Sequence, residues 1–177
     1  MERRQQYSLL FRPAHLNDAE RLSRFAERIF RETYASVNRP DDIEGYVAEQ
    51  FGLQRQQTIL ADPDIETTVV ESDGELIAYA ELWLSVAPDC IDDKNLLEIR
   101  RLYVDQPWQG TSVASSLMQT ILNLAESRPA EGVWLGVWEH SPRAQAFYRK
   151  SGFVRVGQHD FRLGAATQTD HIMYRRF

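Results

Sequence analysis

Apolar residues near the start of the chain follow the spacing of an amphipathic helix. Between Leu22 and Phe30 they recur in steps of three and four, so they share one helix face. The segment Asn17-Asp18-Ala19-Glu20 resembles a capping box at which this helix begins. The preceding run, Tyr7–Arg12, has the pattern of a first strand.

A second helix is predicted after a break at Asn38-Arg39-Pro40. Asp41 or Asp42 can cap this helix, which is expected to run through Phe51. A further short helical segment is expected at Leu53–Leu60, after which the pattern changes to that of strands.

Strand patterns dominate the middle of the chain. Glu66–Glu71 and Glu75–Val86 flank the segment Ser72-Asp73-Gly74, and Asp-Gly between two such runs indicates a β-hairpin. A polar loop at 87–95 leads to a further strand, Leu96–Val104.

Helices and strands alternate in the second half. Helices are predicted at Thr111–Ser127 and Ser141–Ser151, with the strongly apolar strand Gly132–Trp138 between them. The last strands are expected at Phe153–Val156 and Thr169–Tyr174. The order β-α-α-β-β-β-α-β-α-β-β, without a repeat or a linker, predicts an α/β fold in a single domain over residues 1–177.

Composition narrows the classes of protein that this chain can represent. Hydrophobic residues make up 43% of it, yet no apolar stretch approaches the roughly 20 residues that cross a bilayer. Met1–Gln6 does not resemble a signal peptide. Cys90 is the only cysteine, so an intrachain disulfide is excluded. We therefore predict a cytoplasmic protein that does not bind a membrane.

Charge and histidine content exclude two further classes. The formal net charge of −6 argues against a general nucleic-acid-binding face. The four histidines are scattered without the spacing of metal ligands, so no metal site is predicted.

The segment Gln106–Ala114 connects the strand Leu96–Val104 to the next helix through small and polar residues. A helix start leaves up to four backbone N–H groups unpaired and carries the positive end of the helix dipole. Gly110 and Ser112 are small enough to let a phosphate group approach the backbone. The segment matches neither the dinucleotide fingerprint nor the Walker loop. The alternative is a plain tight connection from strand to helix.

Two blocks resemble the GNAT superfamily of acetyl-CoA-dependent N-acetyltransferases. Leu102-Tyr103-Val104 with Gln109-Gly110-x-Ser112-x-Ala114 is similar to its pyrophosphate-binding motif. Ser141-x-x-Ala144-x-x-Phe147-Tyr148-x-x-x-Gly152-Phe153 is similar to the motif of its last helix. The resemblance implies a mixed, mostly antiparallel central sheet flanked by helices. Trp134–His140, with Gly164 and Gln168-Thr169-Asp170 near the end, also resembles bacterial spermidine/spermine N-acetyltransferases.

The resemblance implies acetyl-CoA as cosubstrate and no metal. It puts the pyrophosphate on Gln109–Ser115 and the pantetheine arm along Leu102–Val104, where a backbone N–H stabilises the oxyanion. The cofactor-binding residues predicted in this way are Leu102, Tyr103, Val104, Gln109, Gly110, Thr111, Ser112, Val113, Ala114, Ser115, Ser141, Ala144 and Tyr148.

Acetyl transfer to an amine needs a proton acceptor for the amine and a proton donor for the departing thiolate. Glu98 is the only carboxylate in the strand Leu96–Val104, which the resemblance implies borders the acceptor. Glu98 is therefore the candidate base, acting through water, and the alternative is a solvent-facing or Arg-paired carboxylate. Tyr148 is the candidate general acid, and its alternative is a packing role.

Two residues depart from the family pattern. Ser112 stands in place of the middle glycine of the phosphate motif, which narrows the backbone freedom there. Ser141 stands where the family often has Asn, although Ser is a competent N-cap. These departures leave open a CoA-binding regulatory module without turnover.

The acceptor is expected to be a primary amine of a polyamine, with a peptide or protein amine or another small amine as the alternatives. Asp89, Asp92 and Asp93 precede the strand that borders the site in the family, so they can attract a cationic acceptor. Tyr34 is the candidate gate of the acceptor site. The sequence leaves open whether the protein forms a homodimer.

Overall fold

The computed structural model describes residues 8–177. Its strands and helices largely follow the sequence prediction in order. They are β1 (Leu9–Pro13), the 3-10 turn η1 (Leu16–Asp18), α1 (Ala19–Tyr34), α2 (Pro40–Phe51), α3 (Leu53–Ala61), β2 (Ile65–Ser72), β3 (Glu75–Ser85), β4 (Leu96–Val104), the 3-10 turn η2 (Gln106–Trp108), α4 (Val113–Glu126), β5 (Gly132–Trp138), α5 (Pro142–Lys150), β6 (Val154–Leu163) and β7 (Ala166–Arg176).

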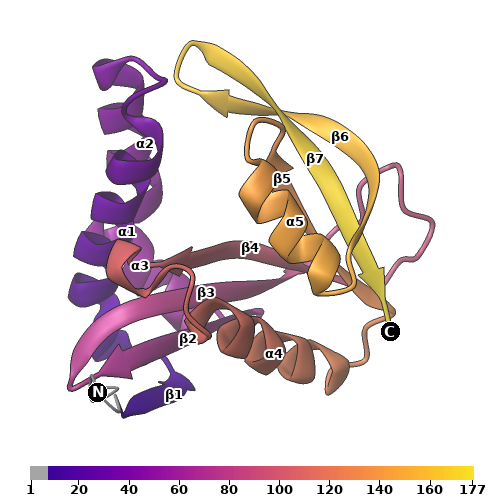
Figure 1. Ribbon diagram of the computed structural model, residues 1–177, viewed down its shortest axis with the longest axis horizontal. Helices are drawn as coiled ribbons and strands as arrows, with labels where there is room; N and C mark the ends of the chain where they lie inside the picture. Colours follow the sequence, from indigo (N-terminus) through magenta and orange to yellow (C-terminus); the bar gives the residue numbers. More distant parts are fainter. Residues whose placement is uncertain (1–7) are drawn as a thin grey trace, which may run out of the picture.

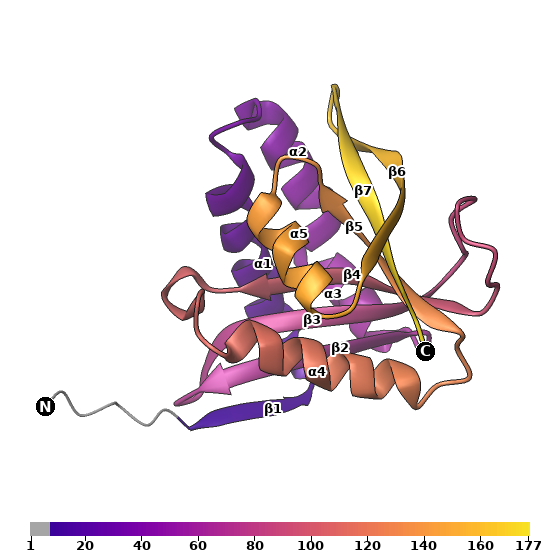
Figure 2. The same cartoon turned by 45° about the vertical axis from the view of Figure 1, so that its right-hand side comes forward.

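One sheet joins the seven strands in the order β1-β2-β3-β4-β5-β7-β6. Its neighbouring strands are antiparallel, apart from β4 and β5, which run parallel. Helices α1, α2 and α3 cover one face, and α4 and α5 lie on the other (Figures 1 and 2). The predicted mixed, mostly antiparallel α/β fold is confirmed.

The first strand and the first hairpin lie close to their predicted positions. β1 begins at Leu9, while Tyr7 and the segment Met1–Gln6 lie outside the described residues. The turn between β2 and β3 is formed by Asp73 and Gly74, with φ angles of +51° and +81°. Two successive positive φ angles match the twist of an antiparallel hairpin, which is why Asp-Gly is a strong signal.

Two helix starts differ from the prediction because their carboxylates bind elsewhere. Asp18 accepts two hydrogen bonds from the Arg12 guanidinium at 2.8 Å, and α1 begins without a side-chain cap from Asn17 or Asp18. α2 begins at Pro40, since proline tolerates the first helical turn, where no N–H partner is available. Asp42 instead accepts a hydrogen bond from the backbone N–H of Ala165 at 3.1 Å.

The β6–β7 hairpin is longer than predicted. The strand expected at Phe153–Val156 extends to Leu163, and the strand expected at Thr169–Tyr174 begins at Ala166. Most side chains of β6 are exposed or half-buried, so the apolar alternation that marks a strand is weak there. Gly164, with a φ of +58°, forms part of the two-residue turn.

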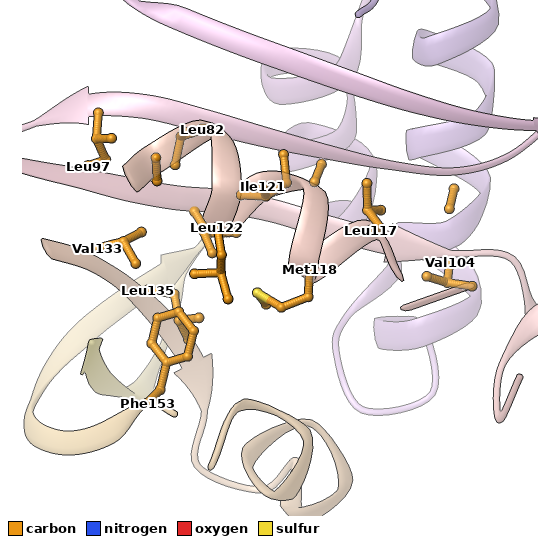
Figure 3. Packing of buried hydrophobic residues seen from close by; sticks show 14 of the residues in the cluster. Leu82, Leu97, Val104, Leu117, Met118, Ile121, Leu122, Val133, Leu135 and Phe153 are labelled. Atoms are coloured by element: carbon orange, nitrogen blue, oxygen red, sulfur yellow. The ribbon is translucent and has the colours of Figure 1, made fainter. Parts of the chain in front are cut away.

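Two hydrophobic clusters hold the sheet from opposite faces. Leu117 and Ile121 of α4 pack against β3, β4 and β5 in the larger cluster (Figure 3). Phe30, Phe51 and Tyr79 belong to the cluster under α1, α2 and α3. Because burial of one such side chain contributes about 1.5–3 kcal/mol, these clusters fix the strands between which the site is built.

Candidate active site

Strands β4 and β5 diverge soon after they come together (Figure 1). Their parallel pairing covers three residue pairs and ends at Glu98 and Trp134. Beyond that point β4 continues beside β3 to Val104, and β5 continues beside β7 to Trp138. A strand edge without a neighbour leaves backbone N–H and C=O groups available to an extended ligand.

The backbone of β4 presents alternate polar groups to this divergence. The Asp105 N–H donates to the Ile77 carbonyl of the β3 side at 2.9 Å. The preceding carbonyl, that of Val104, instead accepts from the Gln109 side chain at 3.1 Å. Because successive peptide groups of a strand point to opposite sides, the backbone groups of Leu102 and Val104 point away from β3.

The turn before α4 forms a cradle of free backbone N–H groups. Gly110 has a φ of +82°, a conformation that residues with a side chain rarely adopt. The Thr111 hydroxyl accepts from the Val113 N–H at 3.3 Å. Within residues 8–177, no acceptor faces the backbone N–H groups of Gly110, Ser112, Ala114 and Ser115.

The serine in the phosphate motif does not strain this turn. Ser112 has φ −77° and ψ −6°, which is right-handed helical geometry open to any residue. A cation also lies nearby, because the Arg143 Nη2 atom is 3.7 Å from the position that a Cβ on Gly110 would take. Free N–H groups, a 14-residue helix behind them and this guanidinium fit the pyrophosphate of CoA.

Helix α5 brings Ala144 and Tyr148 against the main core, one turn apart on the same face. The helix starts with Ser141 as its N-cap, whose carbonyl accepts from the Gln145 N–H at 3.1 Å, although the serine hydroxyl makes no capping bond. Burial raises the pKa of Tyr148 to about 12. The phenol therefore keeps its proton at neutral pH, as a proton donor must.

Glu98 lies at the last paired position before the divergence and is 8% exposed. Its carboxylate accepts from the Ser85 hydroxyl at 3.3 Å and from the Arg100 guanidinium at 3.2 Å. The Arg-paired arrangement that the sequence left open is thus present. The Arg100 side chain is 45% exposed, so solvent screens this ion pair.

The acidic loop before β4 lies away from the divergence, contrary to the expectation from sequence. It leads into the end of β4 that is still paired with β5. Asp93 accepts from the Tyr174 hydroxyl at 2.5 Å and pairs with Arg176 at 3.2 Å. Asp93 therefore lies at the closed end of the strand pair, where β4 and β5 are still hydrogen-bonded to each other. Asp89 and Asp92 lie in the same loop, through which the chain crosses from β3 to β4.

A group that we call the distal wall consists of Tyr34, Asn38, Trp138, Gln168 and Asp170. The Gln168 amide donates to Asn38 Oδ1 at 2.6 Å and ties the α1–α2 loop to β7. The rings of Tyr34 and Trp138 meet edge to face with centroids 6.1 Å apart. Burial raises the pKa of Tyr34, and the charges of Asp170 and of Tyr148 in its ionised form add to that rise. Tyr34 thus lies within electrostatic reach of α5 and of β7.

Sequence reasoning found only part of this wall. The place of Tyr34 on the first helix makes it a candidate, and only the family resemblance points to Gln168-Thr169-Asp170. In the sequence, Asn38 indicates only a break between two helices. Its partner Gln168 is 130 positions away, so no local pattern could join them.

A parallel strand pair that diverges beside a helix start with free N–H groups defines the acyl-CoA N-acyltransferase class of fold. The chain belongs to the acetyltransferase (GNAT) family, whose model matches residues 23–153. It is an acetyl-CoA-dependent N-acetyltransferase. The superfamily, the fold and the cosubstrate expected from sequence are therefore confirmed.

Relatives cover most of the chain. An uncharacterized N-acetyltransferase of Mycobacterium tuberculosis is 33% identical over 160 residues, which are 90% of this chain and 98% of the relative. The solved structure of the PaiA N-acetyltransferase of Thermoplasma acidophilum in complex with coenzyme A matches with a TM-score of 0.78 and 21% identity, over 96% and 99% of the chains. A GNAT acetyltransferase of Streptococcus pneumoniae matches with a TM-score of 0.71 and 15% identity, over 96% and 100%.

Two further features of residues 8–177 concern membrane-spanning helices and metal-binding groups of side chains. None of their helices combines the length and the apolar character that crossing a membrane requires. These residues also contain no group of three or more His, Cys, Asp or Glu side chains arranged to hold a metal ion.

Proposed function

We propose that the enzyme transfers the acetyl group directly from acetyl-CoA to a primary amine of a polyamine. The observation that carries this proposal is the divergence of β4 and β5, with Tyr148 on α5 and the ring pair of Tyr34 and Trp138 in the distal wall. Acetyl-CoA enters from the α4 side, and the amine from the distal wall. The amine nitrogen forms the new bond to the acetyl carbon as the bond from that carbon to sulfur breaks.

Tyr148 is the general acid of this reaction. Its phenol stays protonated because burial raises its pKa to about 12. It donates to the departing sulfur, whose thiol form has an ordinary pKa of about 8.5. The backbone N–H groups of Leu102 and Val104 point away from β3, so they hydrogen-bond the thioester oxygen and the pantetheine amides.

Glu98 is the base that removes the proton of the amine through a water molecule. An alkylammonium with a pKa of about 10.4 holds its proton at neutral pH, so a proton acceptor assists the attack. Glu98 forms an ion pair with Arg100 at 3.2 Å, and solvent can still reach the Arg100 side chain, which is 45% exposed. The position of Glu98 at the last residue pair of β4 and β5 supports its role as the proton acceptor.

Acidic residues between α2 and the β6–β7 turn support a cationic acceptor. A cleft of about 440 Å³ between α2 and the β6–β7 turn is lined by Asp41, Asp42, Glu49, Tyr46, Gly45, Gln50, Arg162 and Gly164. An ammonium group within about 4 Å of a carboxylate gains roughly 1–4 kcal/mol, depending on screening. This cleft replaces the loop of Asp89, Asp92 and Asp93 as the source of attraction.

A thiol-release assay tests the proposal with spermidine, spermine, butylamine and a peptide with a free N-terminus. We expect kcat/KM to be highest for spermidine or spermine, with an advantage that shrinks as salt screens the charges. Tyr148→Phe should lower kcat about 100-fold or more and leave the KM for acetyl-CoA unchanged. Tight CoA binding without CoA release for any acceptor would favour a regulatory module. Preference for the peptide would favour an N-acetyltransferase of peptides or proteins.

A further inference from the structure

Asp170 lies at the centre of the distal wall. It pairs with His159 across β6 and β7, and with Trp138 across β5 and β7. Gly136 of β5 has no side chain and leaves room for both of its neighbours. The position that a Cβ on Gly136 would take is 3.1 Å from His159 Nε2 and 3.4 Å from Asp170 Oδ2. The carboxylate and the imidazole therefore lie side by side over the Gly136 backbone.

Aromatic rings accompany this carboxylate. Trp138 is directly opposite Asp170 in the sheet, and its ring packs edge to face against the ring of Tyr34. The hydrogen bond between Gln168 and Asn38, two residues before Asp170, brings this part of β7 to the α1–α2 loop, and the charge of Asp170 adds to the rise in the pKa of both Tyr34 and Tyr46. A carboxylate with aromatic faces around it is a common arrangement for binding an organic ammonium group.

The Asp170 carboxylate has His159 as a neighbour, but neither a hydrogen bond nor an ion pair among residues 8–177 explains its position. Within the described residues its carboxylate accepts no hydrogen bond and forms no ion pair, although it is half-buried. Asp18 and Asp105, by contrast, are each paired with an arginine at 2.8 Å. An unpaired carboxylate that loses part of its hydration lowers the stability of the fold, so a partner supplied by the substrate accounts for it.

We propose that Asp170 is a specificity-determining residue that binds the ammonium group of the acceptor. This inference rests on the proposed function, because it names the residue that holds the amine beside the thioester. The carboxylate binds the ammonium by a charge-assisted hydrogen bond, and the rings of Tyr34 and Trp138 flank it. Glu98 remains the proton acceptor, and Asp170 orients the nitrogen.

The charges around Asp170 determine its ionisation. Burial raises the pKa of Asp170, and Glu139 raises it further, while His159 and His171 lower it. The phenols of Tyr34 on α1 and Tyr46 on α2 stay neutral, because burial raises the pKa of both. Asp170 therefore gains a proton at a higher pH than an ordinary aspartate, and the affinity for the ammonium should fall from that pH downward.

Asp170→Asn tests the inference by calorimetric titration of spermidine into the CoA complex, which does not require turnover. We expect the affinity to fall about tenfold to 100-fold, since a charge-assisted hydrogen bond is lost. Asp160→Asn is the matched control. It removes the same charge from an exposed position of β6, one residue from His159, and should change the affinity less than about twofold.

Stability separates this role from a structural one. Asp170→Asn should keep or raise the Tm at pH 7, because it removes a charge that burial disfavours. Gly136→Ala is an independent variant whose added methyl group crowds Asp170 and His159. It should raise the KM for spermidine and leave the KM for acetyl-CoA unchanged.

The outcomes distinguish this inference from the proposed function. Weaker spermidine binding by Asp170→Asn supports the inference even if the assay detects no turnover, in which case only the proposed function fails. Equal spermidine affinity of Asp170→Asn and the unaltered enzyme, or no binding by either, overturns the inference. A lower Tm with an unchanged KM would assign Asp170 a structural role instead.

Discussion

The two faces of the sheet are stabilised by different means. The face under α4 is covered by an apolar cluster that includes Leu117, Ile121 and Leu135 (Figure 3). The face under α1, α2 and α3 combines aromatic residues with a buried ion pair, in which Arg101 and Glu81 meet at 2.8 Å with side-chain exposures of 4% and 0%. The cofactor turn belongs to the first face, and the distal wall adjoins the second.

The two faces therefore depend on contacts at different distances along the chain, local in the phosphate turn and long-range on the opposite face. The phosphate turn depends on a few consecutive residues and on the backbone, so it tolerates Ser112 in place of glycine. The opposite face depends on polar contacts between distant elements. Arg101 of β4 also donates to the Gln50 carbonyl of α2 at 3.4 Å, and the Trp83 indole N–H donates to Glu81 at 3.0 Å. Loss of one charge there leaves another without a partner.

The largest effect on stability is expected from Arg101→Leu, which removes the positive charge of the buried ion pair under α1, α2 and α3. The variant leaves the buried Glu81 carboxylate without its Arg101 countercharge and with only the Trp83 indole N–H as a donor, so the free energy of unfolding should fall by about 3–5 kcal/mol. Urea denaturation measures this change. The double variant Glu81→Leu/Arg101→Leu should recover most of the loss, because it removes both charges.

An exposed ion pair provides the control. Arg24 and Glu20 meet at 3.2 Å on α1, with side-chain exposures of 70% and 67%. Arg24→Leu should therefore change the free energy of unfolding by less than about 1 kcal/mol. If Arg101→Leu lost no more free energy of unfolding than Arg24→Leu, the buried pair would stabilise the protein no more than an exposed one.

Gly110→Val tests the apolar face and its phosphate turn. At a φ of +82° a β-branched residue is strained, and the turn must change to accept it. The variant should stay folded but lose the rise in Tm that CoA causes, which corresponds to about 2.7 kcal/mol at 100 times the Kd. Gly45→Ala of α2 is the matched control, since nothing lies within 4 Å of its Cβ position. An undiminished CoA effect in Gly110→Val would place the phosphates elsewhere.

The sequence predicts the cofactor side well because its signals are contiguous. The strand Leu96–Val104, the Gly110 turn and helix α4 follow one another in the chain. The β6–β7 hairpin was underestimated, because its strands carry polar residues on both faces and Gly164 alone does not reveal a turn. Apolar periodicity reports burial, and these strands are little buried.

The acceptor side was predictable only in part. Glu98 stands out as the one carboxylate of an apolar strand, yet its pairing with Arg100 depends on side-chain placement. Asp170 has no local signal, because its importance comes from His159, Gly136 and Tyr34, which lie on three other elements. The prediction that the acidic loop at 87–95 attracts the acceptor was wrong, because sequence proximity to β4 does not tell which end of the strand diverges from β5.

A smaller effect is expected from Glu98→Gln, which tests whether the Glu98 carboxylate takes part in catalysis. The kcat at neutral pH should fall about tenfold or more, because the amide does not accept the proton. The rate should recover partly as the pH approaches the amine pKa of about 10.4, where the acceptor loses its proton unaided. Arg100→Gln is the control, since it removes the ion pair and keeps the carboxylate. A rate of Glu98→Gln that stays low at high pH would show that Glu98 positions the amine.

The smallest effect concerns two aspartates whose pKa values shift in opposite directions. The hydrogen bonds from Arg12 lower the pKa of Asp18 to about 2, whereas burial raises the pKa of Asp170. An aspartate with a lowered pKa stabilises the fold above its unfolded pKa of about 3.9, and that stability is lost as the pH falls to about 2. An aspartate with a raised pKa has the opposite effect. It lowers stability at neutral pH, and protonation of the folded state relieves this cost as the pH falls through the raised pKa, until none of it is left at about 3.9.

Asp18→Asn should therefore lower the free energy of unfolding at pH 7 by about 1 kcal/mol, with a difference from the unaltered enzyme that vanishes near pH 2. Asp170→Asn should raise it at pH 7, with a difference that fades in the acid range. Urea denaturation of the three proteins between pH 2 and pH 7 measures both curves. If both variants lost stability at neutral pH, the distal wall would be held by Asp170 as firmly as β1 is held by Asp18. Opposite signs would show that one carboxylate belongs to the fold and the other is kept at a cost to the fold, as expected of a residue that binds substrate.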